Sequence, residues 1–167
     1  LLALSAQKTL DIQYYIWQKD ITGALLFEAI AEAAQRGVRV RLLLDDNGIA
    51  GLAEALSSLN RLENVQVRIF NPFTQRRFKW LGFITDFSRS NRRMHNKSFT
   101  VDNSVTVIGG RNIGDDYFGA TGGILKQDLD LVAIGSVVNE VSNDFDKYWA
   151  RREKQWFLHR FQRHLLS

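Results

Sequence analysis

One short part of the chain combines a histidine, a lysine, an aspartate and a glycine pair followed by an asparagine. His95 and Lys97 are two residues apart at the start of an expected strand, so their side chains point to the same side. Asp102 follows at the end of that strand, and Gly109-Gly110-Arg111-Asn112 then brings amide donors to the start of an expected short helix, where anions bind readily. This combination favours phosphodiester chemistry, because a neutral imidazole can attack phosphorus while cations and amides hold the oxygens.

The spacing of these residues resembles the HKD motif of the phospholipase D superfamily, His-x-Lys-x4-Asp followed by Gly-Gly-x-Asn. The likeness extends over nearly the whole chain and is closest to the N-terminal half of bacterial cardiolipin synthases of the type C branch. The segments that carry it are Asp11 to Trp17, Arg39 to Gly48, Arg92 to Lys97 and Gly109 to Phe118. One departure is Gly110, where many members have Ser or Thr, so the backbone amide must replace a hydroxyl contact to phosphate.

The resemblance implies a role for each motif residue. His95 would be the nucleophile that forms a phosphohistidine, Lys97 and Asn112 would hold the phosphate oxygens, and Asp102 would be a buried structural and electrostatic member of the catalytic set. Family members also orient the histidine with an acid on a later strand. Asp130 is the first choice for that acid and Asp128 the second, since residues two apart on a strand share a face. No cofactor and no metal are implied.

Periodicity divides the chain into alternating strands and helices. Alternation over 10–16 predicts a strand, helical spacing over 25–34 ending at Gly37 predicts a helix, and the run Val38 to Leu44 predicts a buried strand. A short helix near 52–59 and a strand near 65–70 follow. This β-α-β-α-β order is typical of parallel strands covered by helices.

The second half predicts further strands at 97–101, 105–108 and 129–134, with a hairpin turn at Asp102 to Ser104 and a last helix capped by Ser136. The expected fold is therefore α/β, a mixed and largely parallel sheet with helices on both faces. Residues 1–152 would form one phospholipase D-like lobe with one HKD motif. Residues 153–167 would be a basic amphipathic tail or the start of a linker to a second lobe.

Several polar and aromatic residues at strand ends have a simpler interpretation. We interpret Asp45 and Asp46 as turn-forming residues, although ligands often bind where such strands end. We interpret Tyr14, Tyr15 and Trp17 as residues that pack in the sheet.

Composition sets the class of the molecule. The chain has 167 residues, 45% of them hydrophobic, no Cys and a net charge of +4, which excludes intrinsic disorder, disulfide scaffolds and thiolate sites. No apolar run reaches the roughly 18 residues of a membrane span. Two basic segments, 75–97 with a local charge of +6 and 151–167 with +4, predict phosphate-bearing partners.

The first basic segment also carries aromatic residues without a clear period. We therefore expect it to contact an anionic membrane surface through Arg76, Arg77, Lys79, Trp80 and Phe83. The expected function is phosphatidyl transfer that makes cardiolipin from phospholipid. The expected location is peripheral, on the inner membrane of a bacterial envelope, and the sequence does not assign the leaflet. The alternatives are an endonuclease of the same superfamily, less favoured because of the aromatic residues, and an inactive half-site lobe. The site needs a second HKD lobe, from the same chain or from a homodimer partner.

Overall fold

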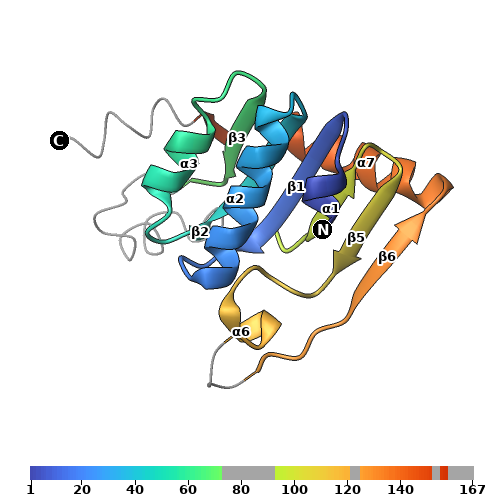
Figure 1. Ribbon diagram of the computed structural model, residues 1–167. Coiled ribbons are helices and arrows are strands. Elements are labelled where there is room, and N and C mark those ends of the chain that lie inside the picture. The colour runs from blue at the N-terminus through green and yellow to red at the C-terminus, as the bar shows by residue number, and fades with distance from the viewer. Residues whose placement is uncertain (73–92, 121–124, 152–154, 158–167) are drawn as a thin grey trace.

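The computed structural model describes residues 1–72, 93–120, 125–151 and 155–157, and Figure 1 shows their arrangement. The elements in chain order are α1 (Leu2–Ser5), β1 (Thr9–Ile16), α2 (Ile21–Gln35), β2 (Arg39–Gly48), α3 (Ala53–Leu59), β3 (Val65–Phe70), β4 (Ser98–Val101), β5 (Val105–Gly109), α6 (Asp115–Phe118), β6 (Asp130–Ile134), α7 (Ser136–Trp149) and β7 (Gln155–Phe157). Within these ranges, no helix has both the length and the apolar character that crossing a bilayer requires.

All strands join one seven-stranded sheet in the order β6-β5-β4-β1-β2-β3-β7. The strands β1, β2 and β3 run parallel to one another, which confirms the expected β-α-β-α-β unit. The four other ladders are antiparallel. The mixed α/β sheet is thus confirmed, but parallel pairing is confined to β1, β2 and β3, because β4 and β5 form an antiparallel hairpin and β6 and β7 join their neighbours in antiparallel fashion.

Local signals in the sequence explain where α2 begins and ends. The carboxylate of Asp20 accepts a hydrogen bond from the Gly23 amide and so caps the start of α2. Gly37, with φ of 93°, follows the end of α2 in the left-handed conformation that glycine adopts without strain. At α7 the expected cap is wrong: Gly135 precedes the helix and Ser136 is its first residue, with no side-chain cap.

The central strands of the sheet are buried on both faces, which confirms the helices expected on each side, whereas β6 remains largely exposed. Leu42 and Leu44 face the larger core, which also holds residues of α1, α2 and α3. The intervening Leu43 faces a smaller core with Phe145 and Trp149 of α7. Figure 1 shows α2 and α3 in front of the sheet and α7 behind it. Because both faces are covered, functional groups can reach solvent mainly at the two ends of the strands.

Strand direction brings the motif residues towards one end of the sheet. β4 runs antiparallel to β1, with Ser98 opposite Gln13 and Val101 opposite Leu10. The residues just before β4 therefore lie beside the carboxyl end of β1. The ladder from β5 to β6 adds the end of β5 and the start of β6 to the same edge, with Gly109 opposite Asp130. Because the residues expected to carry the chemistry lie here, we call this end of the strands the catalytic edge.

The boundary expected at residue 152 does not coincide with the end of the sheet. Residues Gln155–Phe157 form β7, which pairs antiparallel with β3. A strand of the lobe thus lies in the segment that was expected to be a tail. Backbone hydrogen bonds to an edge strand can form such a strand even where the sequence shows no alternation of hydrophobic residues. The rest of the expected tail, 158–167, lies outside the described residues.

Candidate active site at the catalytic edge

His95 lies exposed at the catalytic edge, immediately before β4. Its ring packs on that of Tyr15, with centroids 4.3 Å apart and planes inclined by 34°. Its Nδ1 lies 3.3 Å from the carbonyl oxygen of Arg93. Since a carbonyl can only accept, Nδ1 carries the proton in the neutral ring, and Nε2 keeps a free lone pair. The ring is thus held in the tautomer that a nucleophile needs.

Lys97 supplies a cation next to this histidine. Its ammonium donates a hydrogen bond of 2.7 Å to the carbonyl oxygen of His95 and lies 5.9 Å from the centre of the Tyr15 ring. Burial lowers the pKa of Lys97, and the negative charge of Asp128 partly opposes that change. The ammonium thus offers a charged hydrogen-bond donor beside His95.

Asp45, at the end of β2, holds the backbone segment that leads to His95. Its side chain is fully buried and accepts hydrogen bonds from the Met94 amide at 3.0 Å and the Arg93 guanidinium at 3.2 Å. It also accepts from the Asn47 amide at 2.9 Å, so the expected turn role is correct but incomplete. Burial raises the pKa of Asp45, and these hydrogen bonds and the Arg93 charge oppose the rise.

Tyr15 is a second residue whose place the sequence analysis missed. Its hydroxyl accepts a hydrogen bond of 3.1 Å from the Asn47 side chain, and its ring supports His95. Tyr14, by contrast, is buried in the larger core, as expected, and burial together with the charge of Asp130 raises its pKa. The sequence did contain a signal for this difference. Consecutive residues of a strand point to opposite faces of the sheet, so Tyr14 and Tyr15 cannot both pack in the same core.

The two motif glycines allow β6 to approach closely. A Cβ on Gly109 would lie 2.1 Å from Asp130 Oδ1 and 2.5 Å from the Leu129 carbonyl oxygen. A Cβ on Gly110 would lie 2.2 Å from Asp128 Oδ1. The Gly110 amide donates to the Leu129 carbonyl at 3.2 Å. The expected role of Gly110 in phosphate binding is therefore corrected, because strand pairing already occupies its amide.

The two candidate orienting acids have other partners. Asp130 accepts from the Arg111 amide at 3.2 Å and forms an ion pair of 3.1 Å with the Arg111 guanidinium. The charge of Asp128 acts on Lys97. Neither carboxylate forms a hydrogen bond with His95 in this structure, where the Arg93 carbonyl stands at Nδ1 instead. The sequence could not predict this contact of Nδ1, because every residue has a backbone carbonyl and no residue type marks which carbonyl will face the ring.

Asn112 lies beside the end of β1, as part of the same edge. Its side chain is 6% exposed, and its Oδ1 accepts from the Ile16 amide at 3.0 Å. Its Nδ2 donates to the Tyr117 hydroxyl at 3.2 Å. An amide nitrogen has two hydrogens, so one N–H of Asn112 is not used by these contacts.

Asp102 lies at the opposite end of the strands, in the turn between β4 and β5. Its carboxylate accepts hydrogen bonds from the backbone amides of Gln7, Lys8 and Thr9 at 2.7 to 3.3 Å. Burial would raise its pKa, but these bonds together lower it. Asp102 is therefore not part of the site. A strand of four residues separates it from Lys97, and its role here is to tie the hairpin to β1.

The residues expected to contact a membrane, Arg76, Arg77, Lys79, Trp80 and Phe83, lie in 73–92, outside the described residues. Over the part of the chain that the structure describes, no group of three or more His, Asp or Glu side chains is arranged to hold a metal ion. Of the residues expected in the site, the structure places His95, Lys97 and Asn112 at this edge, with Asp45 and Tyr15 beside the segment that carries His95.

Comparison with known proteins agrees with this arrangement. Residues 2–149 match the family described as "Cardiolipin synthase, PLD-like domain". The chain is 61% identical to cardiolipin synthase C of Escherichia coli K12 over 148 residues, 89% of this chain and 31% of that protein. It thus spans about a third of the length of this curated relative.

Solved structures share the fold at low sequence identity. Phosphatidylserine synthase of Haemophilus influenzae Rd KW20 superposes with a TM-score of 0.70 at 16% identity, covering 94% of this chain and 35% of that one. NucT of Helicobacter pylori superposes with a TM-score of 0.67 at 16% identity, covering 93% and 86%. The match of the family description over residues 2–149, nearly the whole lobe, shows that this chain belongs to the PLD-like domain family of the cardiolipin synthases.

Proposed function

We propose that this chain is one lobe of a phosphatidyltransferase that makes cardiolipin through a phosphohistidine at His95. The observation that carries the proposal is the arrangement around this ring: Nδ1 faces a carbonyl, one ring face is covered by Tyr15, and the Lys97 ammonium stands beside it. The 61% identity to cardiolipin synthase C supports the choice of substrate class.

The proposed reaction has two displacements at one phosphorus. Nε2 of His95 attacks the phosphorus of a phospholipid, a P–N bond forms, and the P–O bond to the headgroup alcohol breaks. The departing alkoxide takes a proton from a general acid. The hydroxyl of an acceptor lipid then attacks the same phosphorus, gives its proton to the base left by the first step, and breaks the P–N bond. Lys97 and the unused N–H of Asn112 would hold the non-bridging oxygens.

A second histidine is needed for the acid and base steps, and the described residues contain one histidine at the edge. We propose that a second HKD lobe supplies it, in the same chain or in a homodimer partner. The length of the relative, of which this chain covers 31%, supports a second lobe in one chain. His95 would then face the second histidine across the catalytic edge.

We further propose that the lobe works peripherally at the inner membrane of a bacterial envelope. The support is the sequence of 73–93, which contains six basic residues and five Phe or Trp residues. Each basic residue near an anionic surface contributes about 1 kcal/mol, and aromatic rings add apolar burial that salt does not screen. A nucleic-acid groove made of the same bases would lose affinity steeply as salt rises.

The direct test is to trap the intermediate on the full-length protein. Labelled phosphatidylglycerol should yield an acid-labile phosphoramidate on His95, and His95→Ala should lower cardiolipin formation at least about 10³-fold. Wild-type activity in His95→Ala, or loss of activity with chelators, would contradict the mechanism.

A second assay separates lipid from nucleic acid as the partner. Co-sedimentation with anionic vesicles should persist at high salt, and replacing Trp80 and Phe83 should weaken it more at high salt than at low salt. A DNA titration over the same salt range is the control. Tight, salt-sensitive DNA binding without vesicle binding would favour the endonuclease.

A further inference from the structure

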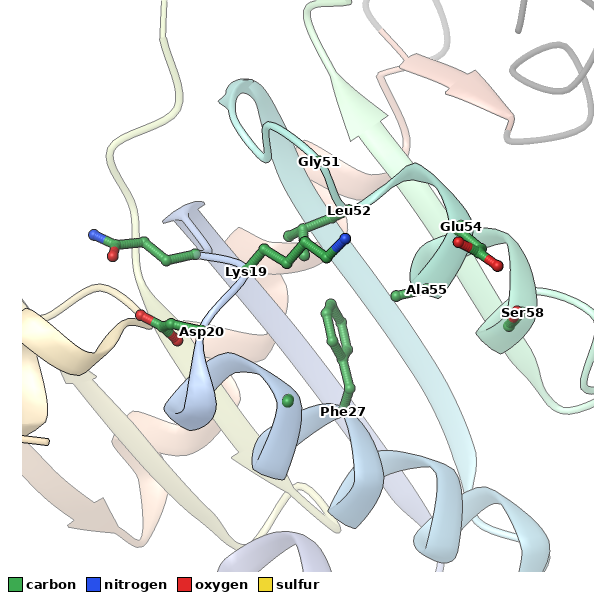
Figure 2. A pocket seen from close by; sticks show the side chains of 10 residues that line it. Lys19, Asp20, Phe27, Gly51, Leu52, Glu54, Ala55 and Ser58 are labelled. Carbon is green, nitrogen blue, oxygen red and sulfur yellow. The ribbon is translucent and has the colours of Figure 1, made fainter. Parts of the chain in front are cut away.

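A hollow of about 420 Å³ opens between the amino-terminal parts of α2 and α3, close to the catalytic edge. Figure 2 shows the Lys19 side chain lying across it, with the Phe27 ring below. Its apolar wall is formed by Ala24, Phe27, Leu52 and Ala55. Phe27 is held from behind by stacking on Trp17, with ring centroids 4.4 Å apart. The hollow is therefore a preformed apolar surface with a cation at its rim.

This hollow adjoins a second one, which includes the residue that packs on the His95 ring. A neighbouring hollow of about 300 Å³ is lined by Tyr15, Asn47 and Gly48, and the two share Gln18 and Lys19. Tyr15 in turn carries the His95 ring. To reach the hollow between the helices, a molecule bound at His95 would have to pass Tyr15 and cross the ends of β1 and β2.

Lys19 is the cation on this path. It is exposed, and among the described residues no ion pair engages its ammonium. The adjacent carboxylate of Asp20 is committed to the amides of Gly23 and Asp115, at 2.9 and 2.6 Å. The other acid of the hollow, Glu54, projects from α3 on the far side in Figure 2. An anion would therefore be accepted at the Lys19 end, where the two hollows meet.

We propose that this hollow binds the acceptor phospholipid, with Lys19 on the phosphate that does not react. The inference rests on the proposed function. Cardiolipin contains two phosphates joined through one glycerol, so the acceptor brings its own phosphate to the site while the other phosphate is on His95. A single ammonium suits that phosphate, and the apolar wall suits the first methylene groups of its lipid part.

The test uses the full-length protein and a phosphatidyl donor with a p-nitrophenol headgroup. Release of p-nitrophenol reports the first displacement. The phosphatidyl group then goes to phosphatidylglycerol, giving cardiolipin, or to water, giving phosphatidic acid. We expect Lys19→Ala to lower the ratio of cardiolipin to phosphatidic acid about fivefold, and Lys19→Glu to lower it more. Lys19→Arg should restore most of the ratio.

Two further variants complete the design. Ala55→Trp fills the hollow without changing charge and should also lower the ratio. Lys8→Ala removes an equally exposed lysine at the opposite end of β1 and should behave as wild type. An unchanged ratio in both Lys19→Ala and Ala55→Trp would overturn the assignment, as would an equal loss of p-nitrophenol release and cardiolipin. A wild-type protein that releases p-nitrophenol but makes no cardiolipin would overturn the proposed function itself, and the assignment with it.

Discussion

The two ends of strand β4 use polar residues in opposite ways. At one end, the Asp102 carboxylate accepts three backbone hydrogen bonds and joins the hairpin to the start of β1. At the other end, His95 is exposed, touches Tyr15 with its ring and leaves Nε2 without a protein partner in the described contacts. A group with its bonding capacity satisfied stabilises the fold, whereas a group with capacity left can act on a substrate.

The comparison divides the HKD motif into two physical roles. His95 and Lys97 belong to the catalytic edge, and Asp102 belongs to the structural edge. Changes at His95 and Lys97 should lower activity and leave stability nearly intact. Changes at the structural edge should lower stability and leave the activity of the folded fraction intact. The predictions below test this division.

Among the residues around His95, the largest effect is expected at Asp45. Asp45→Asn keeps the shape but removes the charge that holds Arg93 and the Met94 amide, so His95 should lose its position. We expect kcat to fall about 10- to 100-fold, with KM nearly unchanged, because a displacement near 1 Å can cost that much. Steady-state kinetics measure the split between kcat and KM.

The matched control is Asp146→Asn. Asp146 lies on α7 and pairs at 2.7 Å with Arg41 of β2, which also pairs with Asp11 at 2.6 Å. The activity of this variant should stay within about twofold of wild type, as expected for an exposed ion pair. If Asp45→Asn is as active per folded molecule as this control, Asp45 has only the turn role.

A smaller effect should distinguish Asp128 from Asp130. The charge of Asp128 opposes the lowering of the Lys97 pKa, so Asp128→Asn should lower that pKa further. If activity needs the Lys97 ammonium, the alkaline limb of the pH–activity profile should then move to lower pH. Asp130→Asn, which removes the partner of Arg111, should leave that limb of the pH profile in place. A fall in turnover at Asp130→Asn without a shifted limb would instead support Asp130 as the acid that orients His95.

The structural edge should respond in stability. Asp102→Asn keeps an acceptor oxygen and tolerates the observed φ of 51°, but it loses the charge. We expect a loss of about 1 to 2 kcal/mol in the free energy of unfolding at pH 7. The pKa of Asp102 is lower in the folded state, so this contribution is complete above the unfolded value of about 3.9 and disappears as pH falls through the folded value.

Urea titrations at several pH values measure this difference. Wild type and Asp102→Asn should converge in acid. The activity of the folded variant should equal that of wild type, and a specific loss of kcat would place Asp102 in the site after all.

The smallest effect is expected at the Tyr15 hydroxyl. Tyr15→Phe removes one exposed hydrogen bond to Asn47 and keeps the ring under His95, so activity should change by about twofold or less. Tyr15→Leu removes the ring contact and should cost about three- to tenfold, in line with the value of an aromatic pair. Equal effects of the two substitutions would assign the role of Tyr15 to its hydroxyl.

The sequence predicted most elements of this fold because their signals are local. Val65 to Phe70 is the strand expected from its pattern, and Gly37 ends α2 as a left-handed glycine must. Pairing direction was harder. The hydrophobic runs of β4 and β5 do not show whether a strand joins a neighbour in parallel or antiparallel fashion, and four of the six ladders are antiparallel.

The site was predicted in its chemistry and only partly in its contacts. The types and spacing of His95, Lys97 and Asn112 were sufficient to propose phosphodiester chemistry, because side-chain reactivity belongs to the residue itself. The tertiary structure decided that Asp45 holds the Met94 amide 49 residues away, that the Gly110 amide pairs with Leu129, and that Asp102 lies at the other edge. These are contacts between segments distant in sequence, and they depend on strand order and direction, which no local pattern encodes.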